Sequence, residues 1–125
     1  MANPNIVNVA AIYGNISNTA LTTTSATQLL SNAASSGIVL KLNSIVVANV
    51  DGSSAADITI NIYSAAALGG TAYPIASTIS VPSDATLIVL DKTTAVYIME
   101  NMSVGATAGT ANDLTVTCSW EALNS

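Results

Sequence analysis

The chain has 125 residues, of which half are apolar and 7% are charged, and its net charge is −5. Its length fits one compact domain and excludes a second one. Soluble domains usually carry about 25% charged residues, so most of this surface must consist of neutral Ser, Thr, Asn and Ala side chains. Broad neutral surfaces are uncommon on monomers, and the composition therefore predicts a symmetric homo-oligomer, for which we expect a trimer.

Several residue types that carry chemistry are scarce. The chain has no His, a single Cys and no Arg, because its two basic residues are Lys41 and Lys92. General bases, bidentate phosphate clamps and zinc sites most often need the missing side chains. We therefore expect no enzyme, no catalytic residues, no cofactor and no metal. Nucleic-acid binding needs cations that neutralise phosphates, so a nucleic-acid partner is also excluded.

No signal peptide or membrane span is visible in the sequence. Residues 1–5 carry no basic side chain ahead of an apolar core. Purely apolar runs such as residues 45–48 and 87–90 are far shorter than the roughly 20 residues that a spanning helix needs. We expect no membrane partner. The lone Cys118 cannot form an internal disulfide, which suits synthesis in a reducing cytoplasm.

The first forty residues contain no charged side chain, which is unusual for a segment exposed to water. Two interpretations remain open. This segment is either an ordinary first strand inside the domain, or residues 1–20 form an arm that is laid on, or exchanged with, a neighbouring subunit. In the second case the interface candidates are the apolar residues Ile6, Val7, Val9, Ile12 and Ile16.

Residues 25–34 place apolar side chains at a helical spacing, but Thr and Ser crowd the same stretch, and we predict a strand or a loop. Residues 38–50 predict a long strand. Its inward-facing set changes parity at Asn43 and Ser44, which indicates a β-bulge or a bend. A strand of this length is also expected to cross from one sheet to the other.

Strict alternation of apolar and polar residues marks the strand at residues 57–63, where Ile58, Ile60 and Ile62 face inward. The same pattern places Val116, Cys118 and Trp120 on the inner face of the last strand, residues 114–121. Further β-branched runs occupy residues 75–81, 86–91, 95–99 and 103–108, and short turn sequences separate them. The chain is thus predicted to be all-β: one antiparallel β-sandwich or jelly-roll-like domain of about seven to nine strands over residues 1–125.

The candidate chemical groups have structural explanations. Asp51 and Asp57 flank a Gly-Ser-Ser loop and could offer oxygens to calcium, but the dense ligand pattern of an EF-hand is missing, and a hairpin turn explains them better. Cys118 lies on the inward parity and is expected to be a buried, inert thiol. Trp120 could stack on a carbohydrate, but its parity favours the core.

A set of sequence motifs resembles a small β-sandwich module that recurs in virion proteins of tailed bacteriophages. The motifs are Ser44-Ile45-Val46-Val47-Ala48-Asn49-Val50-Asp51-Gly52 with the alternating strand to Tyr63, then Val81-Pro82-Ser83-Asp84, the strand at 86–90, Asn101-Met102-Ser103-Val104, and the closing strand at 114–123. The resemblance covers residues 37–123. Many relatives have Gly-Asp in the turn before the penultimate strand, where this chain has Glu100, Asn101 and Met102.

A protein that consists of this module alone, with a neutral surface, is most similar to head decoration (cement) proteins of phages. The resemblance implies a non-enzymatic virion protein on the capsid exterior, made in the host cytoplasm, that bridges capsomers and has itself and the major capsid protein as partners. The alternative is a neck, tail or fibre component with a receptor- or glycan-binding surface. That role would favour exposed aromatic residues among Tyr13, Tyr63, Tyr73, Tyr97 and Trp120.

Overall fold

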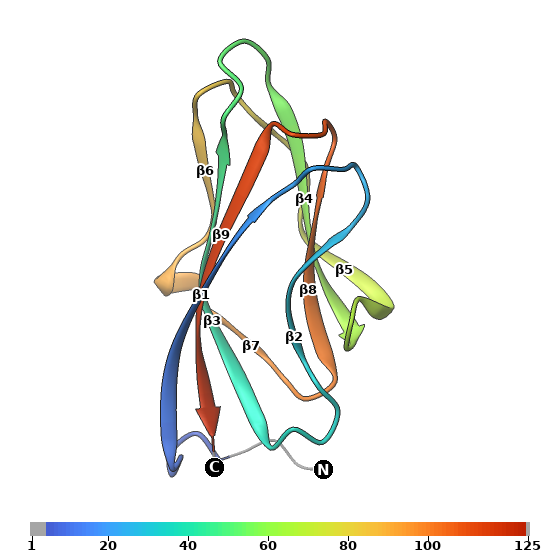
Figure 1. Cartoon of the computed structure of the whole chain (residues 1–125). Coiled ribbons are helices and arrows are strands. Elements are labelled where there is room, and N and C mark those ends of the chain that lie inside the picture. Colours follow the sequence, from blue (N-terminus) through green and yellow to red (C-terminus); the bar gives the residue numbers. More distant parts are fainter. Residues whose placement is uncertain (1–4, 125) are drawn as a thin grey trace.

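The computed structural model of the chain describes residues 5–124 and consists almost entirely of β-strands (Figure 1). The elements are β1 (Ala11–Ala20), β2 (Thr27–Asn32), β3 (Ile38–Asn49), β4 (Ala56–Ala65), β5 (Gly69–Val81), β6 (Thr86–Leu90), the short 3-10 helix η1 (Lys92–Thr94), β7 (Val96–Ile98), β8 (Met102–Ala108) and β9 (Leu114–Asn124). The prediction of an all-β antiparallel sandwich is confirmed. No helix in the described residues is long and apolar enough to cross a membrane.

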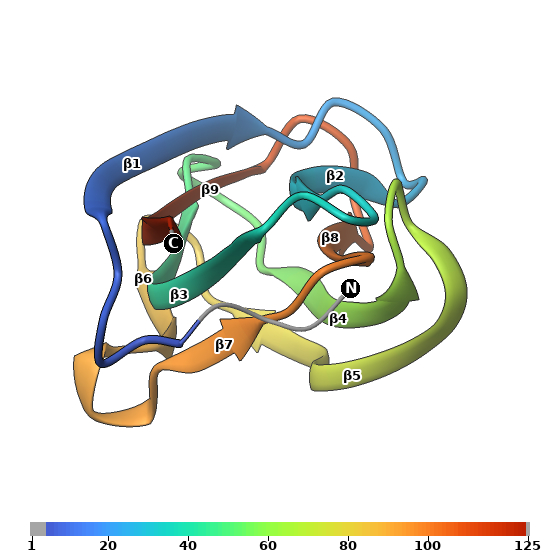
Figure 2. The same cartoon turned by 90° about the horizontal axis from the view of Figure 1, so that it is seen from below.

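The strands form two sheets that pack face to face (Figure 2). Sheet A has the order β1-β9-β3-β6, with β7 also paired to β3, and sheet B has the order β2-β8-β4-β5. All pairs are antiparallel. The chain passes repeatedly from one sheet to the other, and the first strand lies beside the last, as in a jelly roll.

The core lies between the sheets and follows the predicted alternation. Ile58 and Ile60 of β4 and Val116 and Cys118 of β9 belong to one core cluster, and all four side chains are fully buried. Trp120, which its parity assigned to the core, is half-buried and packs against this cluster from its margin. Because most inward residues are β-branched or Leu, they fill the space between two pleated surfaces without large aromatic side chains.

Strand β3 carries the predicted irregularity. Its register with β9 shifts between Leu42 and Ser44, so Asn43 has no partner on β9. The expectation that this strand crosses between sheets is wrong, because β3 pairs with β9, β6 and β7 and therefore stays in sheet A over its whole length. The bulge inserts one residue and returns the inner face to Ile45 and Val47, so the strand continues in place.

Residues 25–34, predicted as a strand or a loop, agree with the prediction, whereas the start of β5 differs from it. The stretch at 25–34 contains a strand, β2. β5 begins at Gly69 rather than at residue 75, because the chain reverses at Ala67 and Leu68, both at positive φ, with Gly69 N donating to Ala66 O at 3.1 Å. The Gly69-Gly70 pair, which reads as a turn in sequence, already belongs to β5.

Candidate interaction surface

Strand β1 is an edge of sheet A and is anchored to the domain through β9. The Ser17 hydroxyl lies 3.3 Å from the Cys118 thiol, on the inner side of the sheet. On the outer side, the Thr117 hydroxyl donates to the side-chain oxygen of Asn18 at 2.8 Å. Burial raises the pKa of the Cys118 thiol, while the Ser17 contact lowers it to a lesser extent. Cys118 is therefore a protonated core group, as its parity indicated.

The backbone of β1 presents half of its polar groups away from the domain. The register with β9 is uninterrupted from Ala11 to Ala20, and just beyond it Leu21 N donates to Leu114 O at 2.9 Å. In an antiparallel pair, residues alternate between bonding the partner strand and facing away from it. Residues of the same parity as Leu21 therefore bond β9, and the others direct N–H and C=O outward. These outward groups belong to Ile12, Gly14, Ile16, Asn18 and Ala20. We name these five residues the β1 edge.

The side chains of the β1 edge are open to solvent in the described structure. Ile12 and Ile16 are among the large apolar residues that stay exposed, Ile16 with 65% of its surface. A Cβ placed on Gly14 would meet no heavy atom within 4 Å. Two interface candidates from the sequence thus lie on one side of one strand, next to unpaired backbone groups.

The other three interface candidates precede β1 and do not belong to a strand. Ile6 and Val7 are exposed and Val9 is half-buried. This segment makes a local turn, in which Asn8 N donates to Asn5 O at 3.2 Å, and it joins the end of β9 where Ala10 N donates to Asn124 O at 2.7 Å. Figure 2 shows it passing around the outside of sheet A near that end. Burial of these residues by another chain stays a prediction, as does an exchange of residues 1–20, of which 1–4 lie outside the described part.

A small apolar row on sheet A was missed by the sequence analysis. Leu123 of β9 has Ile12 of β1 and Val39 of β3 as its cross-strand neighbours. Leu123 and Val39 are buried, but neither belongs to the central core cluster. The sequence signal that could have revealed this row is that Leu123 and Val39 alternate with Ala122 and Leu40, which pack in the core. Ile12, Leu123 and Val39 thus form an apolar row that crosses β1, β9 and β3.

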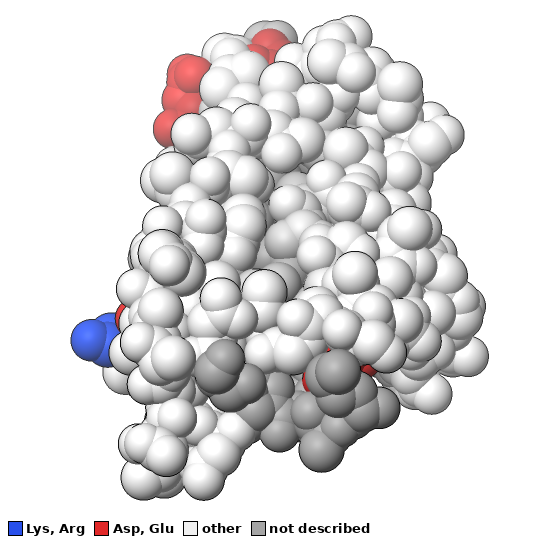
Figure 3. All heavy atoms as spheres, turned by 60° about the horizontal axis from the view of Figure 1, so that its bottom comes forward, with Lys and Arg blue, Asp and Glu red and all other residues white. Residues whose placement is uncertain are grey.

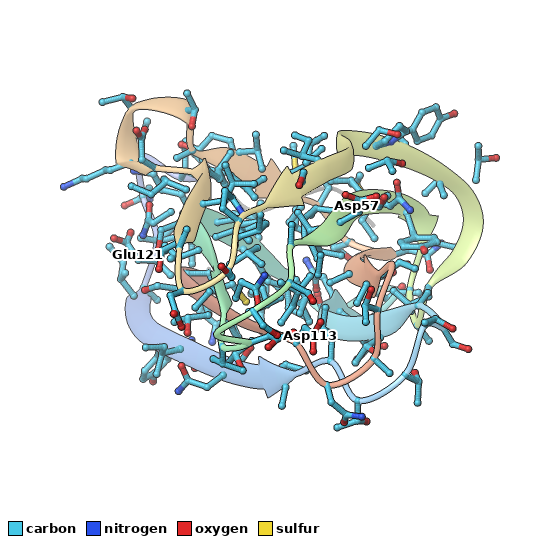
Figure 4. All side chains as sticks on the ribbon, turned by 90° about the horizontal axis from the view of Figure 1, so that it is seen from above. Asp57, Asp113 and Glu121 are labelled. Atoms are coloured by element: carbon cyan, nitrogen blue, oxygen red, sulfur yellow. The ribbon has the colours of Figure 1, made fainter. Side chains whose placement is uncertain are left out.

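The carboxylates do not assemble into a site. Figure 4 shows Asp57, Asp113 and Glu121 well apart, on β4, in the turn before β9 and on β9. Asp51 accepts hydrogen bonds from Ser53 N at 3.1 Å and from the Ser53 hydroxyl at 3.0 Å, which is the geometry of a turn. Within residues 5–124, no group of three or more His, Cys, Asp or Glu side chains could hold a metal ion.

Asp91 is the carboxylate with the clearest local function. It caps η1 by accepting from Thr93 N at 2.9 Å, and the Thr93 hydroxyl also donates to it. These bonds, the Thr93 hydroxyl above all, lower the pKa of Asp91 below its ordinary value. The residue is fully exposed, so the cap organises a surface turn.

The surface is otherwise neutral and closed. Figure 3 shows one face on which charged atoms are few and most of them lie near its margin. No pocket opens in the described part of the chain. The exposed tyrosines Tyr13, Tyr73 and Tyr97 lie on β1, β5 and β7, so they do not form one aromatic platform. Among the described residues, the β1 edge combines outward backbone groups with exposed isoleucines on an uninterrupted strand.

No family model matches the chain, and no curated protein sequence does either. Among solved structures, the chain is similar to one from a study titled "Bacillus endospore appendages form a novel family of disulfide-linked pili", with 15% identity, a TM-score of 0.52, and coverage of 90% of this chain and 88% of that one. At this identity the likeness shows the fold alone. The two chains share this fold over nearly the whole of both.

Two viral capsid structures resemble the chain more weakly. The infectious bursal disease virus VP2 subviral particle matches with a TM-score of 0.48 and 11% identity, over 91% of this chain and 32% of that one. The Gx strain of the same virus matches with a TM-score of 0.45 and 14% identity, over 93% and 31%. The chain therefore spans about one third of the length of these capsid proteins.

Proposed function

We propose that this chain is a non-enzymatic structural subunit of a phage virion, and specifically a capsid decoration protein that stabilises the head by bridging capsomers. The observation that carries the proposal is the β1 edge of a long neutral strand, where the outward backbone groups have no partner in the described residues and two isoleucines are exposed. Exposed strands of this kind are usually guarded by charge or proline, so an unguarded one indicates a surface that works in contact with other chains.

Three further features support this role. The sequence motifs of residues 37–123 resemble a virion module, the chain is a jelly roll, and its carboxylates are dispersed over separate turns and strands. Jelly rolls also serve many unrelated functions, so the fold alone does not select one. The partners implied are copies of this chain, for which composition predicts a trimer, and the major capsid protein.

A neck, tail or fibre component is the alternative. The observation in its favour is the likeness to a pilus protein along most of both chains. The pili of that study are disulfide-linked. In this chain the single cysteine is fully buried in β9, so folded subunits have no exposed thiol with which to form such a link.

Cryo-electron microscopy of the virion that contains this chain tests the proposal. We expect density for the sandwich on the outer surface of the capsid shell, in contact with at least two capsomers. Density at the neck, tail or fibres instead would overturn the decoration role in favour of the alternative. Absence of the chain from purified particles would overturn both.

Purified protein added to undecorated heads provides a second test. We expect saturable binding, and heads that release their contents at a higher temperature than bare heads. Binding without any gain in head stability would contradict the bridging role.

A further inference from the structure

The edge strands of the sandwich differ in how they are protected. β5 is interrupted by Pro74, by three shifts of register against β4, and by a positive φ at Thr78. β2 has six residues and a register shift of its own, and β6 has five residues and ends beside the charged pair Asp91 and Lys92. Short strands, proline, bulges and charge are the usual devices that prevent edges from pairing.

β1 has none of these devices. It is ten residues long, its register is continuous, and it contains no proline and no charged residue. An edge of this kind is a template for another extended strand, because each outward N–H and C=O lacks a partner in the described structure. The occupant must therefore be a strand of comparable length that is also uninterrupted at its own edge.

We infer that the occupant is β1 of a second copy of this chain, paired antiparallel across a two-fold axis that passes beside Ile16. The five outward-directed residues of the β1 edge are spaced evenly about Ile16. A two-fold axis at this point places Ile12 opposite Ala20, Gly14 opposite Asn18, and Ile16 opposite its own copy. This register uses every outward backbone group of both strands, and it joins the two A sheets into one continuous sheet.

Charge and symmetry favour a second copy over a strand from another protein. Residues 11–20 are neutral, so two copies with a net charge of −5 can meet here without placing carboxylates in the ladder. A basic partner strand would find no acidic residue along β1. An isologous contact also needs only one surface that complements itself, which the even spacing about Ile16 supplies.

The inference concerns the free protein in solution and does not depend on where in a virion the chain lies. It selects a two-fold contact, whereas the trimer expected from composition would need a head-to-tail contact between two different surfaces. The location of the chain in a virion and its pairing in solution are therefore separate results, and either can fail alone.

Light scattering of the full chain at micromolar concentration measures whether the free protein is a dimer. We expect a mass of twice 12.5 kDa. The variant Ile16→Lys places two ammonium groups opposite each other on the axis and should weaken dimerisation by roughly tenfold or more. Ile88→Lys is the matched control, because Ile88 on the β6 edge is 62% exposed against 65% for Ile16. This control should remain dimeric, and thermal melting should show that both variants are folded.

Cross-linking tests the position of the axis. Opposed residues of a hydrogen-bonded antiparallel pair have Cα atoms about 5.5 Å apart, which is within the range for a disulfide. Under mild oxidation the variant Ile16→Cys should form a covalent dimer, and Ile88→Cys should not. A monomeric or trimeric wild-type mass, a dimer that Ile16→Lys leaves intact, or an Ile16→Cys dimer that does not cross-link would each overturn the inference.

Discussion

The side-chain amide of Asn32, on β2 of sheet B, donates a hydrogen bond to the carbonyl of Ile98, on β7 of sheet A, at 3.2 Å. The same amide donates to Ile38 O at 2.8 Å, and its oxygen accepts from the Ser36 hydroxyl at 2.6 Å. Asn32 is buried. A polar side chain therefore links the two sheets within an apolar environment, and its hydrogen bonds offset the cost of its burial.

Asn49 makes an equivalent connection at the other end of β3. Its amide donates to Ser54 O and to Val81 O, both at 2.9 Å, and its oxygen accepts from Asp51 N at 2.9 Å. Val81 ends β5 in sheet B, so this side chain also joins the sheets. The two asparagines fix the separation of the sheets near both ends of β3.

Asn49→Asp should be strongly destabilising. The aspartate has nearly the same shape but cannot donate, so a buried carboxylate would face two carbonyl oxygens, at a cost of about 3 kcal/mol or more. The matched control is Asn18→Asp, because the Asn18 oxygen is the acceptor and an aspartate keeps that bond. Urea denaturation of both variants gives the comparison, and equal midpoints would contradict the role of Asn49.

Substitutions at two adjacent residues of β4 test the assignment of its faces. Ile60 is 0% exposed and Asn61 is half-buried on the opposite side of the strand. Ile60→Asp buries an unpaired carboxylate and should cost several kcal/mol, roughly 3 or more, whereas Asn61→Asp should cost about 1 kcal/mol or less. Thermal melts of the two variants that coincide would show that the faces are wrongly assigned.

Cys118 predicts a loss of stability in alkaline solution. Its pKa in the folded chain lies above the ordinary value of 9.0, because the buried thiol resists ionisation. The folded state thus keeps a proton that the unfolded chain releases, so this contribution is complete below pH 9 and is lost as the pH rises above it. The melting temperature of the wild type should fall more steeply above this pH than that of Cys118→Ala, and parallel curves would contradict the prediction.

The turn between β4 and β5 predicts a stabilising substitution. Ala67 and Leu68 both have positive φ, a conformation that favours glycine or asparagine. Leu68 N donates to the Ser103 hydroxyl at 2.9 Å, and Ala67 is exposed. Ala67→Gly should therefore raise the free energy of unfolding by about 0.5–1 kcal/mol. Differential scanning calorimetry measures the change, and a lower melting temperature would count against it.

Removal of residues 2–10 separates the segment before β1 from β1 itself. This deletion leaves the ladder between β1 and β9 complete, so the melting temperature should change little, while attachment to undecorated heads should weaken. Deletion of residues 2–16 also removes more than half of β1 and should lower stability markedly. If the shorter deletion unfolds the protein, the segment belongs to the domain's own core; if binding is unchanged, the contact surface lies elsewhere.

The sequence predicted the fold where alternation was strict and failed where distant side chains decide the backbone. The faces of β4 and β9 follow directly from period two, because one side of each strand must be buried. The reversal at Ala67 does not, since its N–H bonds the Ser31 hydroxyl of β2 and the preceding Ala66 N–H bonds Asn101. These acceptors lie more than thirty residues away, and no local pattern contains them.

The candidate surface was predictable in part for the same reason. The absence of charge over the first forty residues indicated an unusual segment, but where the strand begins within it depends on pairing with β9. The alternation of residues along β1 also identifies those that face outward only once the pairing of β1 with β9 is known. The row formed by Ile12, Leu123 and Val39 needs three strands from distant parts of the chain, so single-strand patterns could not reveal it.

The pairing of β1 with β9 has a consequence for biosynthesis. Among the described strands β1 is made first and its partner β9 is made last. At 5–20 residues per second, β1 waits on the order of 5–20 s for that partner. During this interval both sides of the neutral strand are unpaired, while neighbouring ribosomes on the same message carry identical strands. Nascent chains on one polysome therefore have the opportunity to pair through β1 before any of them has completed its own sandwich.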